Sequence, residues 1–466
     1  MYNPIKSHIP FEPTTGQWLA LQKLDVFIEQ DFEVFILQGY AGTGKTTLMK
    51  GVLDYLDTIK RPYRLMASTG RAAKVLANKT SRKVLTIHST IYSLDEAKSK
   101  VDEKQKLLAF KLRLNLDPPD TIYFVDEASM IADKTESNQS LLFDDGRFLD
   151  HIFRYVGRRK IVFVGDTAQL PPVNCSFSAA MSADYLTNTY RKKVVEVALT
   201  DVKRQNDYCG IIDNATKLRE KLVSGRIPPI GIEASGWDDI SVSQNIWNAI
   251  AGFSRQDYHK GPDHSIFIAL SNGSTHFINQ QIRKSIYREN DPQLKPGDWL
   301  MVIQNNSVTG YNNGQHLILK SFSDTNEQVG EVHLIDAVVE DPDSGEEKMV
   351  KMIKDLLFSA QPNTTFEQDK AFTVDFAIRM KKYGIRPGSE EFISRLMFDH
   401  RLNALKVKFG YAVTCHKAQG GEWKKVFIHL EPAFEKLQRD AQYRWMYTAI
   451  TRASDHVNFP SNPIIF

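Results

Sequence analysis

Short apolar runs alternate along this chain with segments whose apolar positions recur every three to four residues. Four runs of strand length stand in the N-terminal half, at 34–37, 64–67, 122–125 and 161–164. Each run leads into a polar or glycine-containing loop, and helical patterns lie between the runs. Runs that are apolar at consecutive positions are typical of parallel strands buried on both faces. The pattern therefore predicts a doubly wound α/β layer built on a parallel sheet.

A second α/β layer is predicted in the C-terminal half, where apolar runs at 265–270 and 426–430 resume the pattern. The stretch between them is rich in Asp, Glu, Asn and Gly and carries only brief apolar strands, so it reads as a small β-rich insert. The length of 466 residues leaves room for two or more domains. The expected domains are 1–190 for the first layer, 191–291 with 402–466 for the second, and 292–401 for the insert.

Another insert, at about 91–118, interrupts the first layer. Its first half is charged, and its second half alternates apolar and polar residues from Leu108 through Phe110 and Leu112 to Leu116. A period of two is typical of a half-exposed strand. We therefore expect one arm of a protruding hairpin here.

A phosphate-binding loop is the strongest chemical signal. Residues 39–46 read Gly-Tyr-Ala-Gly-Thr-Gly-Lys-Thr, directly after an apolar strand and directly before a helical pattern. In that setting backbone N–H groups cradle a nucleotide β-phosphate, Lys45 bridges the β- and γ-phosphates, and the Thr46 hydroxyl holds Mg²⁺. The alternative, a glycine-rich turn, leaves the fixed Lys and Thr unexplained, so we expect ATP or GTP binding. The expected nucleotide contacts are Gly39, Gly42, Thr43, Gly44, Lys45, Thr46 and Thr47.

Two further strand ends carry polar residues suited to hydrolysis. The strand at 122–125 leads into Asp126 and Glu127, and we expect Asp126 to hold Mg²⁺ together with Thr46 and Glu127 to act as general base. The strand at 161–164 leads into a segment with Gln169, whose amide is expected near the γ-phosphate. A solvated strand end and a Gly/Pro turn are the structural alternatives for these two segments.

Composition limits the remaining classes. The chain is 42% hydrophobic and 25% charged, with a net charge of +3, which permits a nucleic-acid partner without requiring one. Its three cysteines form no C-x-x-C pair, so neither a zinc site nor a disulfide framework is expected. Neither an apolar signal region nor a membrane-length apolar run occurs, and we expect a cytoplasmic protein.

Several segments, in a fixed order, resemble the superfamily-one helicases, most closely the B group that contains RecD and the phage Dda helicase. Besides the phosphate loop and Asp126-Glu127, the segments that carry the resemblance are 15–17 (Thr-Gly-Gln), 67–73, 86–89 (Thr-Ile-His-Ser), 199–205, 414–422 and 445–453. The resemblance implies two RecA-like domains, with a hairpin insert in the first and an SH3-like β-barrel in the second. It also implies an ATP- and Mg²⁺-dependent DNA helicase that acts as a monomer and moves 5′ to 3′.

The same resemblance assigns roles to single residues. Gln17 would read adenine, Arg204 and Arg452 would reach the γ-phosphate, with Arg452 as arginine finger, and Gly420 and Glu422 would approach the nucleotide. The single-stranded DNA contacts would be Thr69, Thr86, His88, Asn272, Thr414 and His416.

The hairpin is our candidate for the wedge that separates the two DNA strands, and Phe110 is its candidate stacking residue. Phe110 could equally anchor the hairpin to its own domain. The expected partners are single-stranded DNA and forked duplex DNA. Two other functions remain open from the residues: an RNA helicase of the same superfamily, and a nucleotide-dependent switch that never unwinds.

Overall fold

The computed structural model describes residues 3–93, 108–138, 141–201, 209–387 and 389–466. Arg204 and the charged half of the expected hairpin lie outside these residues. Among the described helices, none is long and apolar enough to cross a membrane.

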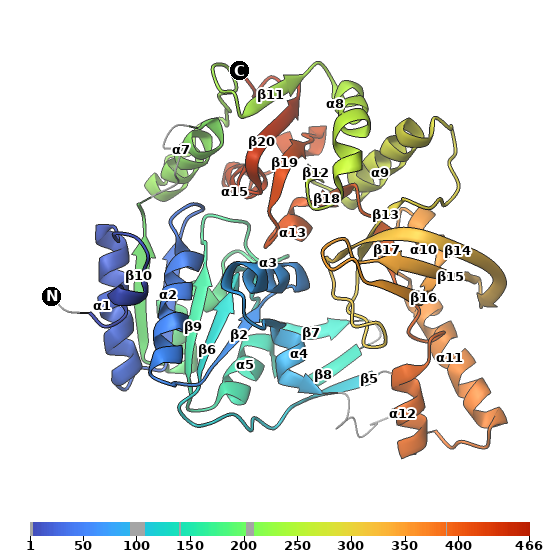
Figure 1. The fold of residues 1–466 in the computed structure, drawn as a ribbon, viewed down its shortest axis with the longest axis horizontal. Helices are drawn as coiled ribbons and strands as arrows, with labels where there is room; N and C mark the ends of the chain where they lie inside the picture. The colour runs from blue at the N-terminus through green and yellow to red at the C-terminus, as the bar shows by residue number, and fades with distance from the viewer. Residues whose placement is uncertain (1–2, 94–107, 139–140, 202–208, 388) are drawn as a thin grey trace.

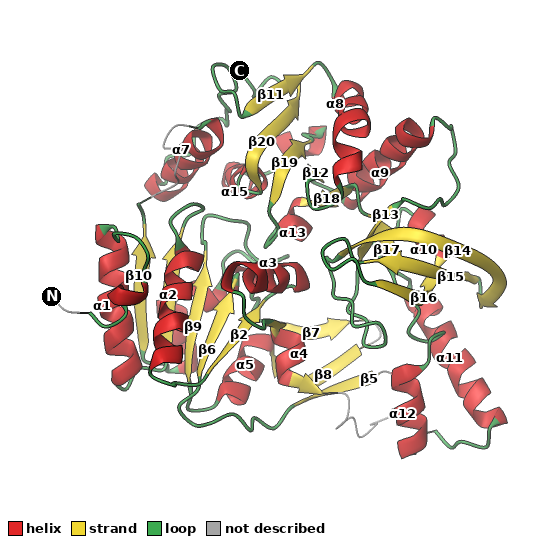
Figure 2. Ribbon diagram, viewed as in Figure 1, coloured by secondary structure: helices red, strands yellow, loops and turns green. Residues whose placement is uncertain are grey.

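The first layer is a six-stranded parallel sheet flanked by helices (Figures 1 and 2). In sheet order its strands are β10 (Val194–Leu199), β1 (Val34–Gly39), β9 (Lys160–Gly165), β6 (Ile122–Asp126), β2 (Tyr63–Ala67) and β3 (Leu85–Thr86). Its helices are α1 (Thr15–Glu29), α2 (Lys45–Thr58), α3 (Gly70–Thr80), α4 (Ile87–Ile91), α5 (Phe148–Val156) and α6 (Ala183–Tyr190).

The consecutive apolar runs belong to strands covered on both faces, as expected. Along β1, Phe35 and Leu37 enter one buried cluster, whereas Val34 and Ile36 enter another on the opposite face of the sheet. Because β10 is the edge strand of this sheet, the first layer extends beyond residue 190, where the sequence analysis ended it.

The second layer is a five-stranded parallel sheet. In sheet order its strands are β11 (Ile240–Ser243), β20 (Ala453–Pro460), β19 (Trp423–Ile428), β12 (Ser265–Ala269) and β18 (Ala412–Thr414). Its helices are α7 (Gly210–Ser224), α8 (Ile246–Gly252), α9 (Asn272–Tyr287), α13 (Cys415–Ala418), α14 (Pro432–Glu435) and α15 (Arg439–Ile450). The fold class is thus the expected α/β arrangement with parallel sheets.

The insert in the second layer is a five-stranded antiparallel sheet with helices. In sheet order its strands are β16 (Glu347–Ile353), β15 (Val332–Glu340), β14 (His316–Val329), β13 (Trp299–Val302) and β17 (Val407–Phe409), and its helices are α10 (Lys354–Phe358), α11 (Phe366–Lys382) and α12 (Glu390–Phe398). The last strand lies beyond residue 401, and the helices α11 and α12 were not expected from the sequence.

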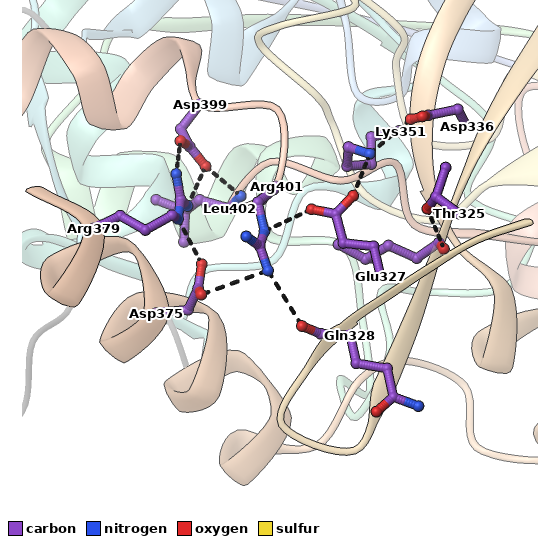
Figure 3. Close-up of polar contacts among 11 residues, drawn as sticks. Thr325, Glu327, Gln328, Asp336, Lys351, Asp375, Arg379, Asp399, Arg401 and Leu402 are labelled. Atoms are coloured by element: carbon purple, nitrogen blue, oxygen red, sulfur yellow. Dashed lines mark hydrogen bonds and ion pairs between the residues drawn. The ribbon is translucent and has the colours of Figure 1, made fainter.

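Ion pairs fasten α11 to this sheet (Figure 3). Arg401 lies 2.8 Å from Glu327, at the far end of β14, and 3.6 Å from Asp375 on α11. Arg379, one turn further along α11, pairs with both Asp375 and Asp399, at 2.8 and 2.5 Å. These carboxylates raise the pKa of Arg379 above its usual value. The charged residues that suggested a polar β-rich insert thus form a network of ion pairs between α11 and the strands of the insert.

The hairpin insert belongs to a four-stranded sheet at the side of the first layer. In sheet order its strands are β4 (Tyr92–Ser93), β5 (Leu108–Leu112), β8 (Leu141–Arg147) and β7 (Thr135–Asn138). The alternation predicted to Leu116 is wrong beyond Leu112, because Leu114 and Leu116 are 75% and 86% exposed. The Asn115 side chain accepts a hydrogen bond from the Asp117 amide and turns the chain away from the sheet.

Candidate nucleotide site and nucleic-acid interface

The phosphate loop lies between β1 and α2, at the carboxyl end of the first sheet. Gly42 and Gly44 both have φ near +80°, a conformation that favours glycine. A Cβ at Gly39 would lie 2.7 Å from the Thr43 hydroxyl, so that position also excludes a side chain. Gly44 is the N-cap of α2, which therefore begins at Lys45 with its free amides toward the loop. The local geometry fits a bound phosphate.

Lys45 folds back over its own loop. Its ammonium donates hydrogen bonds to the carbonyls of Gly39 and Tyr40, at 2.5 and 3.1 Å, and the Thr43 hydroxyl also donates to Tyr40. These are local contacts that an anion in the loop can replace. Thr46 is half-buried beside Lys45, and Thr47 is exposed.

Gln17 contacts the phosphate loop through a hydrogen bond to Thr43. Its side chain is 2% exposed, its amide oxygen accepts from the Thr14 N–H, and its amide nitrogen donates to the Thr43 carbonyl at 3.0 Å. The first contact is half of the capping box that starts α1. Both ends of the amide are thus engaged within the protein, and the adenine contact implied by the family resemblance stays a prediction.

Asp126 ends β6, and Glu127 follows it. Burial and the neighbouring Glu127 carboxylate raise the pKa of Asp126 to about 6, against the opposing charges of Lys45 and Lys79. Glu127 has φ of 51°, a left-handed conformation that is uncommon outside glycine and concentrates at functional sites. The described residues contain no group of three or more His, Cys, Asp or Glu side chains arranged to hold a metal ion. A nucleotide-borne Mg²⁺ needs only one or two protein ligands, and the assignment of Thr46 and Asp126 to that role stays a prediction.

Gln169 carries an unusual acceptor. The side chain is 5% exposed, and its amide oxygen has no hydrogen-bond partner among the described residues. Leaving a buried polar atom unpaired costs about 1–3 kcal/mol, so such an atom calls for a partner. A water or nucleotide group near the phosphate loop would satisfy it. The site fits the expected nucleotide on this observation.

The second layer holds the segment that carries Gln169. The Tyr447 hydroxyl donates to Asp166 at 2.6 Å, and the Thr448 hydroxyl accepts from the Leu170 N–H at 2.9 Å. Gln419, just after α13, donates to the Leu170 carbonyl at 2.8 Å. One wall of the site is therefore built jointly by both layers.

The candidate arginine finger is held within the second layer. Arg452 is 6% exposed and donates to the carbonyls of Thr448 and Gly421 in its own layer. Its role as arginine finger requires the side chain to turn, and it stays a prediction together with that of Arg204, which lies outside the described residues. Glu422 pairs with Lys79 of α3 at 2.8 Å.

Gly420 lies against α3, where a Cβ would come within 2.7 Å of Ala72. Its close packing explains the need for glycine. The approach of Gly420 and Glu422 to nucleotide is not tested by these contacts.

The expected DNA contacts occupy matching places in the two sheets. Thr86 ends the edge strand β3 and caps α4, and Thr414 ends the edge strand β18 and caps α13, each with φ −73° and ψ 153°. On the neighbouring strands, Thr69 follows β2 and caps α3, and Asn272 follows β12 as the first residue of α9. Both layers therefore present a Thr-x-His segment and a polar helix start at the same edge.

The two histidines differ in their surroundings. His88 stacks on Phe148 with ring centroids 4.6 Å apart, so one of its faces is covered within the first layer. His416 is half-buried, and burial lowers its pKa, which keeps the ring neutral at pH 7. The side chain of Phe110 lies outside the described residues, although its backbone belongs to β5.

Beside Thr414, the sequence analysis missed a basic hollow of about 440 Å³ between the second layer and its insert. Its lining includes Asn272, His276, Gln361, Lys408, Thr414 and Lys417. Burial and Lys417 lower the pKa of Lys408 to about 8, and burial lowers that of Lys417. Lys408 donates to the carbonyls of Leu356 and Ser359. Lys408 lines this hollow because its strand β17 pairs with β13, which is distant in the sequence.

Comparison with known proteins agrees with this arrangement. The AAA domain family model matches residues 14–227, and the model of the UvrD-like helicase C-terminal domain matches residues 409–459. The ATP-dependent DNA helicase Dda of Enterobacteria phage T4 is 25% identical, over 94% of this chain and 97% of its own length. The chain is thus similar to the superfamily 1B helicases over nearly its whole length.

Two further similarities span the same length of chain. An uncharacterised protein of Acanthamoeba polyphaga mimivirus is 23% identical, over 96% of this chain and 99% of its own. The crystal structure of a Bacteroides Pif1 helicase with ADP-AlF3 and single-stranded DNA aligns over 97% of this chain and 93% of its own, with 16% identity and a TM-score of 0.49. The phosphate loop lies in the region matched by the AAA domain model, and the Thr414 segment lies in the region matched by the UvrD-like C-terminal model.

Proposed function

We propose that the chain is an ATP-dependent DNA helicase that moves 5′ to 3′ along single-stranded DNA and unwinds duplex. The observation that carries the proposal is the pairing of two features on the same two layers. The Asp166–Leu170 segment beside the phosphate loop is held by the second layer. The same layers end their edge strands in matching Thr-x-His caps. A movement between the layers therefore acts on both sites at once.

On the nucleotide side, each residue has a task that its position permits. Lys45 would exchange its loop carbonyls for phosphate oxygens, and Thr46 with Asp126 would hold Mg²⁺. The bound ATP supplies a γ-phosphate whose charge both layers can contact and whose loss on hydrolysis removes those contacts. Glu127, next to Asp126 in the chain, orients and deprotonates the attacking water. The same water donates a hydrogen bond to the free amide oxygen of Gln169.

On the second layer, Arg452 and Arg204 turn to the γ-phosphate when it is present. Charge-assisted hydrogen bonds of this kind contribute about 1.5–3 kcal/mol each. Two of them supply enough differential free energy to favour a closed cleft, and their loss after hydrolysis lets it open.

On the nucleic-acid side, single-stranded DNA crosses from the first layer to the second along the matching helix starts. Thr69 and Thr86 contact the strand on one layer, and Asn272 and Thr414 contact it on the other, with His88 and His416 beside them. Lys408 and Lys417 add positive charge in the hollow next to Thr414, where a phosphate would neutralise them. Alternate grip by the two layers advances the protein along the strand.

Direction and substrate are tested with forked and tailed duplexes. A duplex with a 5′ single-stranded tail should be unwound with ATP and Mg²⁺, and one with a 3′ tail should not. The Lys45→Ala variant is the control for nucleotide dependence. Unwinding from the 3′ tail would overturn the direction, and ATP hydrolysis without unwinding of either substrate would favour the switch.

The RNA alternative is tested by comparing stimulation of the ATPase by single-stranded DNA and RNA of equal length. We expect DNA to stimulate more strongly. Greater stimulation by RNA would reassign the substrate. Separately, Phe110→Ala should impair unwinding while leaving DNA-stimulated hydrolysis in place, and full unwinding by this variant would remove the wedge role.

A further inference from the structure

One hydroxyl of the second layer holds two segments of the first. The Tyr447 hydroxyl on α15 accepts a hydrogen bond from the Ala41 N–H of the phosphate loop at 3.0 Å and donates one to Asp166 at 2.6 Å. Tyr447 and Asp166 are each 1% exposed. The other oxygen of Asp166 accepts from the Ala168 N–H at 3.0 Å, which fixes the turn that leads to Gln169.

Tyr447 contacts a different group of the phosphate loop from those that Lys45 contacts. The Lys45 ammonium, at the start of α2, meets the carbonyls of Gly39 and Tyr40. The Ala41 amide turns instead toward the second layer. Tyr447 therefore orients the loop without occupying the position where a phosphate would bind.

Polar and apolar contacts together form this part of the interface. Next to Tyr447 is a small hollow, open to solvent, whose lining includes Ala41 of the loop, Ile211 and Arg219 of α7, and Thr451. The Arg219 guanidinium lies 4.3 Å from the ring centroid of Tyr40, the loop residue before Ala41. Tyr40 and Ala41 also pack against the apolar core of the second layer, and the hydrogen bonds of Tyr447 add contacts of fixed direction to this packing.

We propose that Tyr447 is a positioning residue that transmits closure of the two layers to the phosphate loop and to Gln169. The proposal rests on the function proposed above. Tyr447 lies on the helix that leads to Arg452, so any displacement of α15 moves the candidate arginine finger and pulls on Ala41 and Asp166 together. Through Tyr447, DNA binding to the second layer thereby affects the hydrolytic residues of the first layer.

The test compares Tyr447→Phe with Tyr443→Phe. Both tyrosines lie on α15 and are buried, but of the two only Tyr447 forms a hydrogen bond with the described residues of the first layer. The readout is the ratio of the ATPase kcat with saturating single-stranded DNA to the kcat without DNA, which does not depend on the fraction of folded protein. The Kd for ATP without DNA and the thermal unfolding midpoint are measured alongside.

For Tyr447→Phe we expect this ratio to fall at least about fivefold, the scale of one lost hydrogen bond. The Kd for ATP should change less than about threefold, because the phosphate-binding groups belong to the first layer. Tyr443→Phe should leave the ratio unchanged. An unchanged ratio in Tyr447→Phe, even with a lower unfolding midpoint, would overturn the proposal, and so would an equal fall in both variants. A wild-type chain without DNA-stimulated hydrolysis would instead refute the proposed function itself.

Discussion

Arg71 of the first layer contacts both the second layer and its insert, and its removal should open the cleft. The side chain leaves α3 and lies over Trp423 of the second layer, with the guanidinium carbon 3.9 Å from the ring centroid. It also approaches His316 of the insert at 2.7 Å and Asp263 at 3.2 Å. Because the other His316 nitrogen meets the Gly410 carbonyl, that nitrogen carries the proton and Arg71 donates to the free one.

The size of the effect follows from these contacts. A desolvated cation–π contact contributes about 2 kcal/mol, and the hydrogen bond to neutral His316 adds about 1 kcal/mol. Asp263 is 41% exposed, so its ion pair adds little. Arg71→Ala should therefore weaken closure by about 3 kcal/mol, which is a factor of about 150 in the equilibrium between closed and open forms.

Small-angle X-ray scattering of the nucleotide-free protein measures the change as a larger radius of gyration. The matched control is Arg82→Ala, since Arg82 contacts Asp54, Asp57 and Tyr63 within the first layer only. The control should lower stability without changing the radius. Identical scattering from wild type and Arg71→Ala, with both folded, would refute the reasoning.

Three further outcomes are expected. Lys45→Ala should abolish hydrolysis and shift the unfolding midpoint little, because Lys45 bonds only to its own loop; brisk turnover would remove the ATPase assignment. His416→Ala should weaken single-strand binding and DNA stimulation by the same factor at pH 7 and at pH 8, since burial lowers the His416 pKa and the ring does not change charge over this range; an unchanged variant would exclude the contact. Lys408 is charged below its pKa of about 8, so DNA affinity should fall as the pH rises from 7 to 9. Lys408→Met should flatten this pH dependence and reduce the slope of log affinity against log salt concentration by about 1. If the affinity of the variant falls in parallel with that of the wild type, the pH effect belongs to another group.

The sequence by itself determined the elements whose signal is local. The phosphate loop, the strand ends at Asp126 and the Thr-x-His segments are each read within a few consecutive residues, because backbone geometry and capping act over that distance. The consecutive apolar runs likewise predicted buried parallel strands, since a strand covered on both faces has no polar side to alternate.

Only the tertiary structure decided which distant residues meet. Tyr447 and Asp166 are 281 positions apart, and Arg71 and His316 are 245 apart. Neither pair leaves a periodic trace in the sequence, because a hydrogen bond between two side chains places no requirement on their neighbours. The basic hollow at Lys408 depends in the same way on β17 pairing with β13 across the insert. Local sequence thus specified the parts of the candidate motor, and the packing of its layers determined which parts are coupled.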